Sequence, residues 1–530
     1  MGARPMTKVM PRGAPLLETL AGTDNKRIGL GVGAVAFGFF LAGGVLAILM
    51  RTELAQPGLQ VVSLSSYNAL FTMHGSTMIY LFVTPVALAM GLYLVPLQVG
   101  ASGVAGPRWA LAGMWLLVLG GITMWSGWLV QGGAAQATWV GFDPLSDAVH
   151  SPGKAMDSWI WGVVLATLGE LLMAASILAT LLGRRAAGMT MLRMPVFCWA
   201  ELVTCLMVLF AFPVLIGVMI ALWIDRQWGG VFTSPGGPVT YQHLFWFYGH
   251  PVVYVMFFPF LGAVAEVIAV FSGRRIFGYR GIVISLLVFA SLSMSVWAHH
   301  MFTVQGVTVK YFSLTSTLLV VPAGMEYFSL LGTLRGGAIR LTVPMLFALA
   351  FLLQFLVGGL SGIWVASPAL DFHANNSYVV VAHFHYTLLA GSIFGFFAGV
   401  YYWWPKVTGR LLGERLGRVH LALFAIATNL TFAPQFALGE EGMTRRIADY
   451  PRAAGWETLN SLSTLGSYLI AVSVLVFLVN AAVSRRLAGP DPWGGHTLEW
   501  ATLSPPPRGN FEGELPPIRS HAPLLDRVPA

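Results

Sequence analysis

Six of the twelve histidines in the chain lie within long apolar stretches or at the ends of such stretches. They are His74, His250, His299, His300, His383 and His385. A polar ring in apolar surroundings costs free energy unless it binds something, and neutral imidazole is a common ligand of iron and copper. A hydrogen bond between helices explains one such histidine equally well, but six together favour metal binding.

The spacing of two histidine pairs indicates how many groups they bind. His383 and His385 are two residues apart, which is about 200° around a helix, so they face opposite sides and cannot share one metal. His299 and His300 are adjacent, about 100° apart, and can reach one metal together only near the end of a helix.

The remaining two histidines have neighbours that suit a bound cofactor. His250 and Tyr254 are four residues apart and therefore stack on one face of a helix. Gly75 follows His74 and permits the close approach of a flat ring. The six histidines are enough for two axial ligands of one iron, one ligand of a second iron and three ligands of a copper.

The composition places these histidines in a membrane. Of 530 residues, 56% are hydrophobic and 10% are charged, whereas soluble domains have about 25% charged residues. The net charge of +8 comes from basic residues scattered between apolar runs, a pattern that excludes nucleic-acid binding. Cys198 and Cys205 lie in one apolar run, which excludes a disulfide framework and a thiol metal cluster.

The apolar runs predict an all-α integral membrane protein with twelve transmembrane helices, at about 20 residues for each span. The predicted spans are 28–50, 66–98, 109–131, 157–183, 195–224, 243–272, 281–301, 311–334, 340–364, 377–404, 418–438 and 460–484. Most of the 30 Lys and Arg residues fall on the side of both termini, so the positive-inside rule makes both termini cytoplasmic. Residues 1–27 then form a cytoplasmic arm, 28–486 the helical domain and 487–530 a Pro-rich cytoplasmic tail. The outside loops 132–156 and 225–242 are rich in Gly, Pro and aromatic residues, which predicts a structured cap.

Nine segments within about residues 28–515 are similar to one known family. They are RTELAQPG (51–58), YNALFTMHGSTMIY (67–80), GMTMLRMPVFCWAELVT (188–204), YQHLFWFYGHPVVY (241–254), WAHHMFTV (297–304), SYVVVAHFHY (377–386), TNLTFAPQFALG (428–439), GMTRRIADYP (442–451) and TLEWATLSPPP (497–507). On these segments the chain resembles subunit I of the heme–copper oxygen reductases, the cytochrome c oxidase family.

The resemblance implies two hemes. His74 and His385 would be the axial ligands of a low-spin heme, and His383 would bind the iron of a high-spin heme. Arg445 and Arg446 match the pair that holds the heme propionates, which suits guanidinium–carboxylate pairing at low dielectric constant.

The resemblance also implies one copper ion opposite the high-spin heme, bound by His250, His299 and His300, with Tyr254 joined covalently to His250. Arg51 matches the arginine that approaches the formyl group of heme A, so heme A is expected. An arginine that reaches back to the membrane surface is the alternative at that position.

This site implies the activity of a respiratory terminal oxidase. Iron and copper together can supply three electrons to oxygen, and the phenol of Tyr254 can supply the fourth electron and a proton. The implied partners are O2, ferrocytochrome c or another respiratory complex as electron donor, a subunit II that carries the Cu_A centre, and a subunit III. The implied location is the plasma membrane of a prokaryote. Heme type, donor and proton pumping remain open.

The chain departs from the family pattern where protons and magnesium are handled. Val252 stands where the common pattern has a glutamate, and Gly103 stands where it has an aspartate at the mouth of a proton path. Glu326 replaces the lysine of the second path. Asn375 and Asn376 replace the His-Asp pair that binds magnesium, so a magnesium site is not carried over.

Intramembrane carboxyl groups are candidates for the missing proton carriers. We expect protons to move along the helix of Glu326, past Ser316 and Ser313, to the active-site tyrosine. Tyr248, in the position before Gly-His, and Glu170, on the helix of the first path, are further candidates.

Two other functions are compatible with parts of the pattern. A nitric oxide reductase of the same superfamily pairs heme with non-heme iron, which needs a carboxylate ligand, but Val252 and Val253 stand beside the histidine and Tyr254 is kept. A transporter with a proton relay would not need the adjacent His299 and His300, and a heme absorption spectrum decides between these classes.

Overall fold

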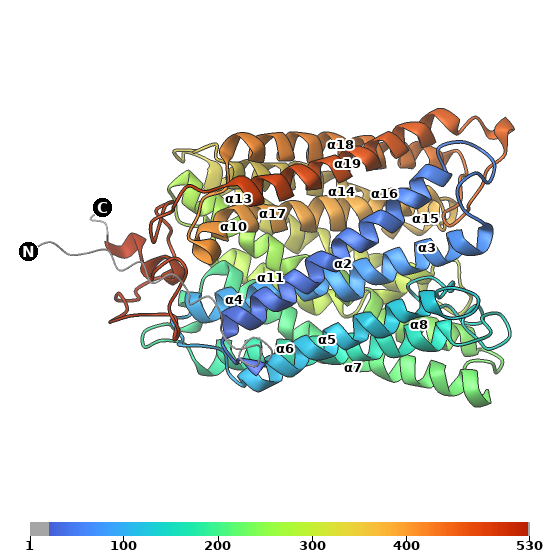
Figure 1. Cartoon of the computed structure of the whole chain (residues 1–530), viewed down its shortest axis with the longest axis horizontal. Coiled ribbons are helices and arrows are strands. Elements are labelled where there is room, and N and C mark those ends of the chain that lie inside the picture. Colours follow the sequence, from blue (N-terminus) through green and yellow to red (C-terminus); the bar gives the residue numbers. More distant parts are fainter. Residues whose placement is uncertain (1–20, 528–530) are drawn as a thin grey trace, which may run out of the picture.

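The chain is a bundle of long helices, with no strand among residues 21–527, which are the residues that the computed structural model describes. Figure 1 shows the helices side by side along the long axis of the molecule. The tail after the last helix lies at the end where α2 (Asn25–Glu53) begins, and Nζ of Lys26 donates to Oδ1 of Asn510 there, at 2.9 Å. We call this end the tail end and the opposite end the loop end. Most of the predicted N-terminal arm, residues 1–20, lies outside the described residues.

Eleven helices in the described part of the chain are long and apolar enough to cross a membrane. Several contain a short break or a π-helical turn. In chain order the elements are α2, α3 (Leu64–Ser76), η1 (Thr77–Val83), α4 (Thr84–Gln98), α5 (Pro107–Trp125), α6 (Ala155–Gly183), α7 (Val196–Trp228), α8 (Gly237–Gly249), α9 (Pro251–Val255), α10 (Phe258–Ser272), α11 (Tyr279–Ser293), η4 (Trp297–Met301), α12 (Val309–Leu318), α13 (Val320–Leu334), α14 (Val343–Ala366), α15 (Pro368–Ala374), α16 (Tyr378–Thr387), η5 (Leu388–Ile393), α17 (Phe394–Thr408), α18 (Glu414–Glu440) and α19 (Glu457–Val483).

The predicted span 281–301 differs from the other eleven. Its α-helix, α11, has 15 residues and ends at Ser293, and a turn leads into the 3₁₀ segment η4. The continuous helix expected there is therefore wrong beyond Ser293. Because the helix ends early, the adjacent residues His299 and His300 leave the helical register and both turn toward the bundle interior.

Glycines bring α5 and α6 into close contact. A Cβ atom on Gly113 would lie 2.5 Å from the carbonyl oxygen of Gly169, and one on Gly120 would lie 2.8 Å from that of Gly162. The two glycines on each helix are seven residues apart and therefore share one face. Small residues at such a seam let backbones approach, which is the common basis of helix association in membranes.

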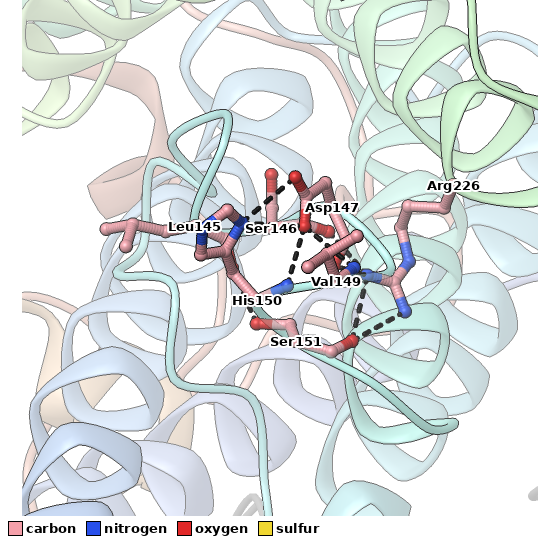
Figure 2. A network of polar contacts seen from close by, with 7 residues as sticks. All are labelled: Leu145, Ser146, Asp147, Val149, His150, Ser151 and Arg226. Carbon is pink, nitrogen blue, oxygen red and sulfur yellow. Dashed lines mark hydrogen bonds and ion pairs between the residues drawn. The ribbon is translucent and has the colours of Figure 1, made fainter. Parts of the chain in front are cut away.

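Arg226, at the loop end of α7, anchors the loop that joins α5 to α6 (Figure 2). Its Nε donates to Oδ1 of Asp157 at 2.9 Å, and Nη1 and Nη2 both donate to the carbonyl of Ser151 at 3.1 Å. Within the loop, the Asp147 carboxylate accepts from the backbone N–H of His150 at 2.7 Å. One buried guanidinium thus holds the first of the two loops of the predicted cap.

The tail packs across the helix ends at the tail end of the bundle. Nε2 of Gln98 donates to Oε1 of Glu499 at 3.0 Å, and Nζ of Lys406 donates to the carbonyl of Thr502 at 2.8 Å. Burial raises the pKa of Glu499, whereas hydrogen bonds from Gln98 and other donors act in the opposite direction.

Candidate metal centre

Three histidines from two segments converge in the loop-end half of the bundle. Nδ1 of His250 lies 3.2 Å from Nε2 of His300, which in turn lies 3.2 Å from Nε2 of His299. These nitrogens all lie within 4.8 Å of one another, and no other group of three or more His, Cys, Asp or Glu residues in the described chain meets that criterion. The donor set is three imidazoles with no carboxylate, which suits copper.

Breaks in the helices allow this convergence. His250 stands between α8 and α9, and Pro251, which has no N–H, begins α9. His299 and His300 lie on the 3₁₀ segment η4. On its far side, Nδ1 of His299 lies 2.7 Å from the Ser316 hydroxyl, which orients the ring and leaves Nε2 for a metal.

Tyr254 lies beside the triad. Its ring centroid is 4.7 Å from that of His250, and Nε2 of His250 is buried without a partner in the protein. This nitrogen is the one that does not face His299 and His300. On its other side, Tyr254 packs against Phe289 of α11 at 4.8 Å.

His74 and His385 share a local arrangement. Nδ1 of His74 lies 2.9 Å from the carbonyl of Gly43, and Nδ1 of His385 lies 2.8 Å from that of Val381, so Nε2 remains free in both rings. Three residues after each histidine the helix changes to a π-helical turn, at Thr77 and at Leu388. Such turns occur frequently at functional sites. Both rings therefore fit axial ligands of one heme.

His383 and His385 face different helices. Nδ1 of His383 lies 3.0 Å from the hydroxyl of Ser361 on α14. The His385 ring stacks on Phe432 of α18, with centroids 4.2 Å apart. These two histidines of α16 can therefore bind two different groups.

Arg51 is a buried arginine with unused donors. Nη2 donates to the carbonyl and to Oδ1 of Asn460, at 2.9 and 3.0 Å, while Nε and Nη1 are buried without a partner. Buried N–H groups without a protein partner fit a bound group whose oxygen accepts from them, such as a formyl oxygen. They do not fit an arginine that reaches back to the membrane surface, whose N–H groups would contact water.

Arg445 and Arg446 lie at the loop end of the bundle. Burial lowers the pKa of Arg445 to about 10 and that of Arg446 to about 9, and for Arg446 the neighbouring guanidinium acts in the same direction. The guanidinium of Arg446 lies over the ring of Phe142 at 5.5 Å. Two adjacent cations in a poorly solvated place fit the carboxylates of heme propionates.

Asn375 and Asn376, which stand where the family has its magnesium ligands, form hydrogen bonds with other side chains. Oδ1 of Asn376 accepts from Nε and Nη2 of Arg445, at 3.2 and 2.8 Å, and Nδ2 of Asn375 donates to Asp371 at 3.1 Å. Burial raises the pKa of Asp371 to about 6. Two amides that are held by an arginine and an aspartate do not fit a magnesium site.

The candidate proton carriers fall into two groups. Glu326 on α13 is 2% exposed, and its Oε1 has no partner. Ser316 contacts His299, and Ser313 donates to the carbonyl of Ala366 at 3.3 Å, so neither hydroxyl bonds to the Tyr254 phenol.

Tyr248 on α8 and Glu170 on α6 form the second group. Both residues are buried, and the Glu170 carboxyl acts electrostatically on the Tyr248 phenol.

Three features of the site were not predicted from the sequence. Trp246 stacks on the His300 ring, with centroids 4.0 Å apart and planes at 11°. Trp139, from the cap loop, packs on Gly75 next to His74, and its carbonyl accepts from the Tyr80 hydroxyl at 3.0 Å. The dense aromatic run 245–248 was a signal for the first feature, whereas no sequence signal marked Trp139 or the carbonyl of Gly43 that orients His74.

Residues 27–469 match the family described as cytochrome c and quinol oxidase polypeptide I. The chain is 47% identical over 523 residues to a probable cytochrome c oxidase subunit 1-beta of Nocardia farcinica, covering 97% of this chain and 89% of that protein. It is 46% identical over 511 residues to a cytochrome c oxidase subunit 1 of Corynebacterium efficiens, covering 95% of this chain and 88% of that protein.

A heme-copper terminal oxidase dimer solved by cryo-EM has the same fold, with a TM-score of 0.70 and 17% identity over 88% of this chain and 85% of that chain. The chain therefore belongs to the cytochrome c and quinol oxidase polypeptide I family, the catalytic subunits of respiratory terminal oxidases. The family is a multi-pass membrane family that binds heme and copper.

Proposed function

We propose that this subunit reduces O2 to water at a site built from the three-histidine cluster, Tyr254 and His383. The reaction takes four electrons and four protons for each O2 and yields two water molecules, with ferrocytochrome c as the one-electron donor. The observation that carries the proposal is the convergence of His250, His299 and His300 within 4.8 Å beside a tyrosine. When bound, the two hemes and the copper supply electron transfer and the oxygen-binding site.

Tyr254 and His250 act as one unit in this proposal. A bond between Nε2 of His250 and a ring carbon of Tyr254 removes one hydrogen from each partner, and O2 accepts the two electrons and two protons. The unpartnered Nε2 and the ring distance of 4.7 Å support this linkage. The linked phenol then donates a proton and an electron during oxygen reduction.

The arginines and asparagines at the periphery indicate which cofactors the chain takes. The unused Nε and Nη1 of Arg51 support a heme A whose formyl oxygen accepts from them. Arg445 and Arg446 hold propionates. Because Asn375 and Asn376 are engaged by other side chains, we assign no magnesium ion to this chain.

Glu326 delivers protons to Tyr254 in this proposal. The Ser285 hydroxyl of α11 lies beside the Glu326 carboxyl, and Phe289, one helical turn after Ser285, packs on Tyr254. We therefore place the route beside α11, with water bridging from the Glu326 carboxyl to the Tyr254 phenol because the Phe289 ring cannot carry a proton. This route avoids Ser313 and Ser316, whose hydroxyls face Ala366 and His299.

The subunit works within a complex in the plasma membrane of a prokaryote. We propose that a subunit II with a Cu_A centre passes electrons from cytochrome c, and that a subunit III completes the complex. No carboxylate belongs to the three-histidine group among the described residues, so no observation favours nitric oxide reduction.

The purified complex should show low-spin and high-spin heme bands, one copper per two hemes outside the Cu_A centre, and oxygen consumption with ferrocytochrome c. Extraction and chromatography of the hemes identify heme A. Glu326→Gln should slow turnover and proton uptake while the heme spectra stay normal, and Glu326→Asp should restore part of the rate. Normal proton uptake in Glu326→Gln would reject this route, and a complex without heme would reject the function.

A further inference from the structure

Two glutamates in the seam between α4, α6 and α7 have no role in the metal centre described above. Glu201 on α7 and Glu170 on α6 are both 0% exposed, and none of their four carboxylate oxygens has a partner in the protein. Burying a carboxyl without a hydrogen bond costs several kcal/mol, and acids within membrane spans are functional by default.

Glu201 meets both neighbouring helices near the tail end. A Cβ atom on Gly91 of α4 would lie 2.6 Å from Oε2 of Glu201 and 2.9 Å from Cδ1 of Ile177 on α6. Gly91, Ile177 and Glu201 therefore lie at one level of the seam. Only glycine at position 91 leaves room for the carboxyl.

The same helix faces carry polar groups two turns closer to the loop end. Thr84 is seven residues before Gly91 on α4, and Glu170 is seven residues before Ile177 on α6. Seven residues return a helix to nearly the same face and rise about 10 Å. The Thr84 hydroxyl is buried without a partner, as the Glu170 carboxyl is. Both groups thus face the seam in the middle of the bundle.

Thr204 and Cys205 lie about one turn closer to the loop end than Glu201 on α7. They follow Glu201 by three and four residues and therefore share its face. The hydroxyl of Thr204 is also buried without a partner. The seam thus has a polar group at nearly every turn, and buried polar groups without protein partners are those that ordered water molecules bridge.

The seam is connected at the tail end as well. Oε1 of Glu499 accepts from Gln98, whose Oε1 lies 3.3 Å from Sγ of Cys198, three residues before Glu201 on the same face. The titratable groups that act on these cysteines are Glu201, Glu266 of α10 and Glu499.

The loop-end side of the seam lies next to the metal centre. Glu170 is within electrostatic range of the phenols of Tyr80 and Tyr248, whose rings stack with centroids 6.2 Å apart. Tyr248 precedes the metal-centre residue His250 by two positions. The Glu170 carboxyl is therefore close to a tyrosine that belongs to the same segment as the metal-centre residue His250.

We propose that this seam is a second proton route, in which Glu201 and Glu170 are the proton carriers between the tail end and the metal centre. The proposal rests on the proposed oxygen reduction, which consumes the protons. The Glu170 carboxyl releases its proton toward the metal centre and takes another from the Glu201 carboxyl through bridging water, and the Glu201 carboxylate then takes a proton from water. Each carboxyl returns to its starting form, and no electron moves.

Glu170→Gln and Glu201→Gln in the purified complex test the route. The reduced complex is mixed with O2 in a stopped-flow instrument, and a pH-indicator dye reports proton uptake. We expect each variant to slow uptake by about tenfold or more, as for the loss of a positioned proton carrier, with unchanged heme spectra. Glu170→Asp should restore uptake, and Glu457→Gln, the same change at an exposed glutamate of α19, should leave it normal.

Infrared difference spectra give a readout that does not depend on turnover. A protonated Glu170 should contribute a carboxyl C=O band that shifts in D2O and is missing in Glu170→Gln. Wild-type proton uptake in both Gln variants, or an identical carboxyl band in Glu170→Gln, would overturn the route. If the proposed function failed instead, the wild-type complex would consume no O2, and the infrared band would still decide whether Glu170 holds a proton.

Discussion

Arg226 permits a quantitative test of how the cap loop is held over the metal centre. Its Nε lies 2.9 Å from Oδ1 of Asp157, and the two side chains are 3% and 13% exposed. At an effective dielectric constant of about 20, two unit charges at that distance attract by about 6 kcal/mol before desolvation is subtracted. In Arg226→Met the only ion-pair partner left to the Asp157 carboxylate is Lys154. Its Nζ lies 3.6 Å from Oδ2 of Asp157, and the lysine side chain is 77% exposed. We expect the free energy of unfolding to fall by about 3–5 kcal/mol.

Thermal unfolding of the purified complex in detergent measures this loss, together with heme content. Arg418→Met is the matched control, because Arg418 pairs with Glu414 at 3.5 Å on an exposed helix face and such pairs contribute about 0.3–0.5 kcal/mol. Arg226→Met combined with Asp157→Asn removes the unpaired charge and should recover part of the stability. Equal shifts of the unfolding midpoint in Arg226→Met and Arg418→Met would refute the reasoning.

His383→Ala should abolish the high-spin heme signal and oxygen consumption but leave the low-spin spectrum, and a normal optical spectrum with full turnover would contradict the assignment. Tyr254→Phe keeps the ring packing and removes the phenol, so we expect a folded complex that retains less than about a hundredth of the oxygen reduction; peptide mapping should find the His250–Tyr254 linkage only in the wild type. Burial raises the pKa of Asp143 to about 6, so its charged form destabilises the fold and stability falls as pH rises from about 4 through 6. Asp143→Asn should therefore raise the free energy of unfolding at pH 8, by up to about 3 kcal/mol, but not at pH 4.

The candidate ligand residues could be proposed from the sequence because residue type and spacing indicate their chemistry, and the structure brings His250, His299 and His300 together. His383 and His385 differ by two positions, so a helix alone dictates that they face different sides. The structure shows that these sides face Ser361 and Phe432. The end of α11 before His299 was harder to predict. The apolar pattern continues through Trp297, and hydropathy does not register that the backbone leaves the helix after Ser293.

The sequence did not predict the roles of residues such as Arg226 and Glu201, because these roles depend on contacts with distant parts of the chain. In the sequence Arg226 is one of several basic residues next to a predicted span. Only the structure shows that it anchors the loop between α5 and α6. Glu201 lies in an apolar run, and only the structure shows that Gly91, more than a hundred residues earlier, makes the space that its carboxyl fills. Such pairs depend on how helices pack, which the periodicity of a single helix does not contain.

The proton route that we propose through Glu326 would not require a carrier of particular charge. The family pattern has a lysine there, which moves between neutral and positive forms, whereas Glu326 moves between negative and neutral forms. Each cycle carries one proton in either case. Apolar surroundings disfavour the charged form of both groups, so a buried lysine rests without its extra proton and a buried glutamate rests with its proton bound. In the two routes that we propose, Glu326, Glu170 and Glu201 would therefore release a proton first and be reloaded afterwards, so that demand at the metal centre, rather than supply from the tail end, would set the timing.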